Sequence, residues 1–181
     1  MQGRSGVGGW LRPVGLGLVL GAGWGVMARV WMRLISTSPE FSWTGTLLII
    51  GFAALAGALL GLVEAARQHG RRAWWRLAAL PGLILFLGQG LVLLPALLLG
   101  GWAWGSRRSG LLRVAAALPL LAVPIWLWYT ASPIDRLLVS PVASIGGFLV
   151  LSVTVAAAGA TWFRAWPVRV PRKGHAQPAM A

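Results

Sequence analysis

The sequence contains no cysteine, and among its 181 residues it has only three acidic residues and two histidines. The absence of cysteine excludes disulfides, thiolate nucleophiles and cysteine-ligated metals. A metal site of the histidine and carboxylate type needs three or four converging ligands, and neither His69 nor His175 has a partner at a suitable spacing. Glu40 and Asp135 could form a pair of catalytic carboxylates, but each has a simpler role as an acid at a helix start beside an arginine. The sequence therefore predicts a protein that is not an enzyme and binds no metal or cofactor.

Charged residues make up only 10% of the chain, whereas hydrophobic residues make up 57% and the mean hydropathy is +0.75. Soluble domains carry about 25% charged residues, so this composition predicts an integral membrane protein. The net charge of +13 could indicate a nucleic-acid partner, but the basic residues stand in short clusters between apolar runs longer than a soluble fold buries. We interpret the basic charge as a topology signal and as contact with anionic lipid headgroups, with no nucleic-acid partner.

Long apolar stretches predict an all-α fold, a polytopic transmembrane helical bundle that forms one domain over residues 13–163. Residues 1–12 are Gly-rich and basic and are expected to be disordered, and residues 164–181 are expected to form a basic cytoplasmic tail. The sequence Ser38-Pro39-Glu40 is typical of a helix start, with serine as N-cap and proline at the first helical position. The four clear spans are predicted at residues 13–35, 41–63, 111–129 and 140–163.

Small residues recur at every fourth position in the first two spans, a spacing that lets membrane helices approach closely. They are Gly17, Gly21 and Gly25 in the first span, and Ala53, Gly57 and Gly61 in the second. We therefore predict that the first two spans form a close antiparallel pair. The last span has a similar face at Ser152, Ala156 and Ala160.

Residues 74–104 form an apolar element that is long for one span and short for two full spans. It is either one long kinked span, or a re-entrant hairpin or two short helices that turn at Gly88-Gln89-Gly90. A single crossing divides the basic residues almost evenly between the two sides of the membrane. A hairpin leaves only Arg29, Arg33 and Arg136 on the outer side, and because positive charge gathers on the cytoplasmic side, we favour the hairpin. Both termini are then cytoplasmic.

Charge at the end of an apolar span is costly and tends to be functional. We hypothesise that a set of polar residues converges into an outward-facing vestibule that binds an anionic group, such as a lipid headgroup or a small acid. The set is Arg29, Arg33, Glu40, Gln89, Asp135 and Arg136. The alternative is that Arg29 and Arg33 extend to the outer phosphates and pair with Glu40.

Two functions follow from these observations. The first is a non-enzymatic membrane protein of unknown role that binds lipid or a partner protein, which could be another membrane protein or a second copy of the chain. The second is a small oligomeric transporter or channel subunit for an anionic or small solute, in which Gln89, the prolines and the arginines would line the path.

Two stretches of the chain are similar to a known group of proteins. They read Arg29-Val-Trp-Met-Arg-Leu-Ile-Ser36 with Pro39-Glu40-Phe41-Ser42-Trp43-Thr44-Gly45-Thr46, and Leu85-Phe86-Leu87-Gly88-Gln89-Gly90 between Leu80-Pro81 and Leu94-Pro95. These stretches resemble an uncharacterised group of bacterial, largely actinobacterial, multi-spanning membrane proteins. The resemblance implies a polytopic inner-membrane protein and carries no activity that can be transferred.

Overall fold

The computed structural model describes residues 8–36, 41–86, 89–105, 110–130 and 139–167, which are almost entirely helical. Within these ranges, α1, α2, α4 and the continuous segment Val142–Phe163 are long and apolar enough to cross a membrane. The prediction of an all-α polytopic membrane bundle is confirmed. In chain order the elements are α1 (Gly8–Leu34), α2 (Trp43–Gln68), the 3₁₀ helices η1 (Ala73–Phe86) and η2 (Gln89–Leu93), the π-helix η3 (Ala96–Gly100), α3 (Gly101–Gly105), α4 (Gly110–Thr130), the π-helix η4 (Val142–Gly146) and α6 (Gly147–Phe163).

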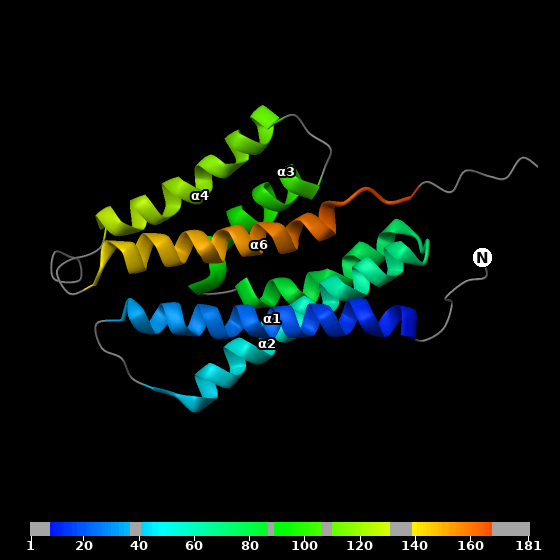
Figure 1. Cartoon of the computed structure of the whole chain (residues 1–181), viewed down its shortest axis with the longest axis horizontal. Helices are drawn as coiled ribbons and strands as arrows, with labels where there is room; N and C mark the ends of the chain where they lie inside the picture. The colour runs from blue at the N-terminus through cyan, green and yellow to red at the C-terminus, as the bar shows by residue number, and fades with distance from the viewer. Residues whose placement is uncertain (1–7, 37–40, 87–88, 106–109, 131–138, 168–181) are drawn as a thin grey trace, which may run out of the picture.

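The chain between α2 and α4 turns back near the middle of the bundle (Figure 1). The first arm, η1, runs beside α2, and the second arm, formed by η3 and α3, runs beside α6 toward the end of the bundle from which η1 came. The first arm ends at Phe86 and η2 begins at Gln89, within the sequence Gly88-Gln89-Gly90 at which the turn was predicted, and residues 87–88 lie outside the described part of the chain. This arrangement is a hairpin of two short arms, and it brings the start of α1 and the end of α6 to the same end of the bundle.

Glycines line the contact between α1 and α2. A methyl group on Gly17 would overlap the backbone oxygen of Gly57, and a methyl group on Gly21 would overlap that of Ala53. The same holds for Gly61 against the backbone of Pro13. The two backbones therefore touch directly along the small-residue faces of both helices, which lateral packing in a bilayer favours.

A second glycine contact joins the other arm of the hairpin to α6. A methyl group on Gly101 would lie 2.7 Å from the backbone carbon of Gly159, and one on Gly100 would lie 2.7 Å from the Ala156 Cβ. Ala156 belongs to the small face predicted for the last span, whereas Gly100 and Gly101 were not predicted to pack against it. The bundle thus contains two glycine contacts, one between α1 and α2 and one between the second arm of the hairpin and α6.

The start of α1 differs from the sequence-based expectation. The helix begins at Gly8, whereas residues 1–12 were expected to be disordered and the span to begin at Pro13. The Trp10 ring stacks on the His69 ring, with centroids 4.8 Å apart, and it also contacts the Trp75 ring. These contacts with the end of α2 and the start of η1 hold the first turns of α1 in place.

Both ends of α2 also differ from the expected boundaries. The N-cap is Ser42, whose Oγ accepts a hydrogen bond from the Gly45 amide at 3.2 Å, while the predicted cap Ser38 lies outside the described residues. The helix continues beyond residue 63 to Gln68 because Glu64 bonds the side chains of Arg67 and Gln68 one turn further on. It ends before Gly70, which has a φ of 61°.

The first glycine contact makes a direct prediction about stability. Gly21→Ala should lower the free energy of unfolding by about 1–3 kcal/mol because the added methyl group has no space beside Ala53. Gly23→Ala is the matched control, since nothing lies within 4 Å of a methyl group on Gly23 and alanine favours a helix by about 1 kcal/mol. Thermal unfolding in one detergent, followed by circular dichroism, measures both. Equal stability of the two variants would contradict the close contact.

Candidate functional site

Arg29 lies on the side of α1 that faces the start of α2. Its Nε donates a hydrogen bond to the Thr46 hydroxyl at 3.0 Å, and that hydroxyl donates to the Ser42 carbonyl at 2.8 Å. The half-buried guanidinium is therefore joined to the first turn of α2 through Thr46. These bonds give Arg29 a structural partner in the next helix.

Arg33 lies one turn further along α1 and is exposed. Its guanidinium carbon is 5.4 Å from the centroid of the Phe41 ring, which packs edge-on against Trp43. This is a cation–π contact at the surface of the bundle, and it leaves the N–H groups at the edge of the guanidinium open to solvent or headgroups. The two arginines and the start of α2 thus form one corner of the molecule.

The predicted vestibule is described only in part. Arg29 and Arg33 meet at the corner just defined, and the Gln89 backbone lies at the start of η2, beside the hairpin turn. The Gln89 side chain and the whole of Glu40, Asp135 and Arg136 lie outside the described residues, so convergence of all six remains a prediction. Within the ranges that the structure describes, no three histidines or acids gather as metal ligands.

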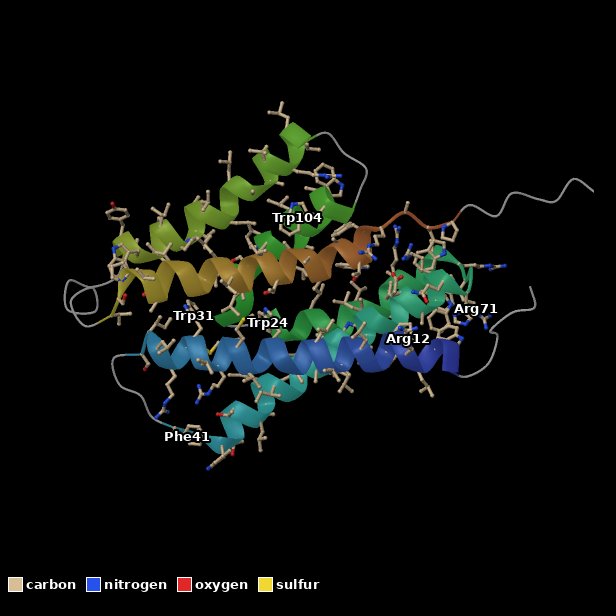
Figure 2. All side chains as sticks on the ribbon, viewed as in Figure 1. Arg12, Trp24, Trp31, Phe41, Arg71 and Trp104 are labelled. Atoms are coloured by element: carbon tan, nitrogen blue, oxygen red, sulfur yellow. The ribbon has the colours of Figure 1, made fainter. Side chains whose placement is uncertain are left out.

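Trp31 lies between the two arginines in the sequence but points to the other side of α1. Figure 2 shows it on the side toward α6, whereas Phe41 lies beyond the opposite side. The Trp31 Nε1 donates to the Ala143 carbonyl at 3.0 Å, and its ring packs edge-on against Phe148 with centroids 5.9 Å apart. A methyl group on Gly147 would overlap the indole ring. The glycine at position 147 therefore makes the space that seats Trp31 against the start of α6.

A cavity of about 300 Å³ opens beside Trp31. It lies where the ends of α1 and α4 meet the start of the last span. Its lining is mainly apolar. Ser144 contributes a hydroxyl to the lining residues, and the Trp31 indole N–H already bonds the Ala143 carbonyl. The lining residues are Trp31, Ile35, Pro124, Leu127, Trp128, Val139, Ser144 and Phe148.

The lining suits an apolar ligand. Two tryptophans and a phenylalanine offer large flat surfaces, and the cavity is near the lower end of the size range of ligand pockets, about 300–1,000 Å³. Tryptophan near the end of a membrane span is typical of the interface between hydrocarbon and headgroups. A site lined by such tryptophans suits the part of a lipid where the acyl chain begins.

Sequence reasoning did not identify this site. Trp31 and Ile35 are four residues apart and so share a helix face, and Gly147 begins an otherwise bulky stretch of the last span. These two signals were present, but nothing in the sequence relates position 31 to positions 143–148.

No protein-family model, no curated protein and no solved structure matches this chain. The functional argument therefore rests on the residues and their geometry.

The Trp31 hydrogen bond makes a testable contribution to the packing of α1 on the last span. Trp31→Phe keeps an aromatic ring but leaves the Ala143 carbonyl without this donor, so we expect the free energy of unfolding to fall by about 1 kcal/mol. Trp43→Phe is the control because Trp43 is 71% exposed, and its effect should stay within about 0.5 kcal/mol. Thermal unfolding of both variants in the same detergent checks the difference. Indistinguishable midpoints would show that the bond adds nothing to stability.

Proposed function

We propose that this protein is a non-enzymatic membrane protein that binds a lipid, with part of an acyl chain in the cavity beside Trp31. The observation that carries the proposal is the apolar and aromatic lining of that cavity, placed between three membrane-spanning segments. A lipid chain in this cavity gains close contacts with aromatic and aliphatic side chains in place of looser contacts with bilayer hydrocarbon. The ligand is therefore held mainly through its chain.

The size of the cavity supports part of a chain as the occupant. About 300 Å³ accommodates a segment of a lipid and not a complete two-chain molecule. Ser144 supplies a hydroxyl for a single polar contact, such as an ester group at the head of the chain. The rest of the lipid would extend along the outer surface of the bundle.

We also propose that the molecule lies in a bacterial inner membrane with the start of α1 on the cytoplasmic side. The hairpin geometry supports this orientation because it brings the start of α1, the connection from α2 to η1 and the stretch after α6 to one end of the bundle. Among the described basic residues, this end holds Arg12, Arg67, Arg71, Arg72, Arg76 and Arg164, whereas Arg29 and Arg33 lie toward the other end of α1. Positive charge gathers on the cytoplasmic side of membrane proteins. Two reporter enzymes can be fused after Ala181, one that is active only in the cytoplasm and one that is active only in the periplasm. The cytoplasmic reporter should be active and the periplasmic reporter inactive. Activity of the periplasmic reporter would reverse the orientation.

Filling the cavity tests the lipid proposal. Ser144→Phe should weaken the binding of an added phospholipid about tenfold, or about 1.4 kcal/mol, because the larger side chain fills the space that the acyl chain would occupy. Native mass spectrometry of the delipidated protein after addition of a defined phospholipid gives the bound fraction.

The control for this experiment is Val150→Phe, which adds a ring of the same size on the last span at a position that is 51% exposed and outside the cavity. This variant should bind lipid as the unmodified protein does. Equal binding by Ser144→Phe and Val150→Phe would overturn the assignment of the cavity.

A further inference from the structure

Three segments of the chain meet at the end of the bundle opposite Trp31 and Phe41. Figure 2 shows Arg12 and Arg71 at this end. The segments are the start of α1, the connection from α2 to η1, and the stretch that follows α6. They bring together a basic–aromatic cluster, which we define as Trp10, His69, Arg71, Trp75, Arg76 and Trp166.

Both the backbone carbonyl and the guanidinium group of Arg76 form hydrogen bonds with the end of the last span. The Arg76 carbonyl accepts a hydrogen bond from the Trp162 Nε1 at 3.1 Å, and the Arg76 Nη2 donates to the Arg164 carbonyl at 2.8 Å. Its guanidinium carbon lies 5.5 Å from the centroid of the Trp166 ring. The end of the last span thus fixes the position of this guanidinium group.

Arg71 lies in the same arrangement. Its carbonyl accepts a hydrogen bond from the Trp166 Nε1, so this indole contacts both arginines. The Arg71 guanidinium carbon lies 5.9 Å from the centroid of the Trp10 ring, whose other contacts are His69 and Trp75. The Arg71 side chain is exposed, so its charge faces the solvent or headgroup region.

The charges of the cluster are uncompensated in the described part of the chain. Glu64 forms an ion pair there with Arg67, whose Nε lies 2.9 Å from the Glu64 Oε2, and no such pair involves Arg71 or Arg76. The Arg76 Nε is buried and has no hydrogen-bond partner among the described residues. A buried donor of this kind costs free energy, and native proteins commonly satisfy it with a ligand, an ion or water.

We propose that the basic–aromatic cluster binds the phosphate group of an anionic membrane lipid, with Arg71 and Arg76 as the charged contacts. Each guanidinium lies near an indole ring, and the N–H edge of the exposed Arg71 matches the oxygens of a phosphate group. Tryptophans at the end of a span place this edge at headgroup depth. Basic pockets between membrane helices recognise anionic headgroups in this way.

This site is separate from the cavity beside Trp31, which lies at the other end of the bundle and takes an apolar chain. The two proposals can fail independently. Ser144→Phe should leave phosphate recognition unchanged, and loss of Arg71 should leave the cavity unchanged.

The test compares two short-chain lipids that differ in headgroup charge, phosphatidylglycerol and phosphatidylcholine, each titrated onto the full-length protein in a neutral detergent. Native mass spectrometry gives the dissociation constants. The unmodified protein should prefer phosphatidylglycerol. Arg71→Gln and Arg76→Lys should each weaken phosphatidylglycerol binding about tenfold, because each removes charge-assisted hydrogen bonds to the phosphate.

Arg113→Gln is the matched control, since Arg113 is an exposed arginine on α4 outside the cluster. It removes the same charge as Arg71→Gln and should change the affinity less than twofold. Arg76→Lys keeps the positive charge but removes the planar guanidinium group. Because the Arg71 side chain is exposed, Arg71→Gln reports on binding even if a change at Arg76 disturbs folding.

Three results would overturn the proposal. Equal affinity for the two lipids would show that headgroup charge is not recognised. An equal loss in Arg113→Gln would show a general effect of charge. Inorganic phosphate that binds alone and displaces phosphatidylglycerol at equal concentration would assign the site to a soluble phosphate instead of a lipid.

Discussion

The structure depends on direct contact between helix backbones. Within a bilayer, helices gain little from hiding apolar surface, so their association relies on close packing, and glycine permits the closest approach. Gly17 meets Gly57 so tightly that a single methyl group on either would overlap the other helix. Because α1 and α2 are fixed in this way, α2 can receive η1 on another face, where a methyl group on Gly82 would lie 3.3 Å from Ala56. The α1 helix can then present Trp24, whose Nε1 donates to the Thr154 hydroxyl at 3.1 Å, toward the last span.

The hairpin contains backbone that is unusual for a membrane protein. The 14 residues of η1 form a 3₁₀ helix, although such helices seldom exceed 3–4 residues, and η3 is a π-helix. Irregular helical geometry at membrane depth is tolerated where other parts of the protein cover it, and here α2 covers one arm while α6 covers the other. Because the hairpin returns to the end from which it entered, Arg76 lies beside Arg164 and Trp166, and the basic–aromatic cluster can form.

Local regularities made much of the fold predictable. The length of the apolar stretches indicated the spans, and the four-residue spacing of small residues indicated the face on which Gly17, Gly21, Gly57 and Gly61 lie. The sequence analysis predicted Ser38 as the N-cap of the second span, whereas the structure shows Ser42 as the N-cap of α2. Both serines precede an apolar run, and only the geometry of the helix start distinguishes them. Gly101 and Gly105 are also four residues apart and both meet the last span, but nothing in the sequence relates this pair to Gly159. The candidate sites were the least accessible to sequence reasoning, since Trp31 meets Ala143, and Arg71 meets Trp166, only through the fold.

Our central proposal is that residues 73–105 return to the side of the membrane from which they enter. The chain has no cysteine of its own, so single cysteines introduced at the exposed positions Arg72 and Gly110 can be labelled without background. A membrane-impermeant maleimide applied to sealed vesicles of one orientation measures which face each position occupies, with a cysteine at Ser42 marking the opposite face. The hairpin predicts that positions 72 and 110 react from the same face and position 42 from the other. Labelling of positions 72 and 110 from opposite faces would show that the element crosses the membrane once and would contradict the account.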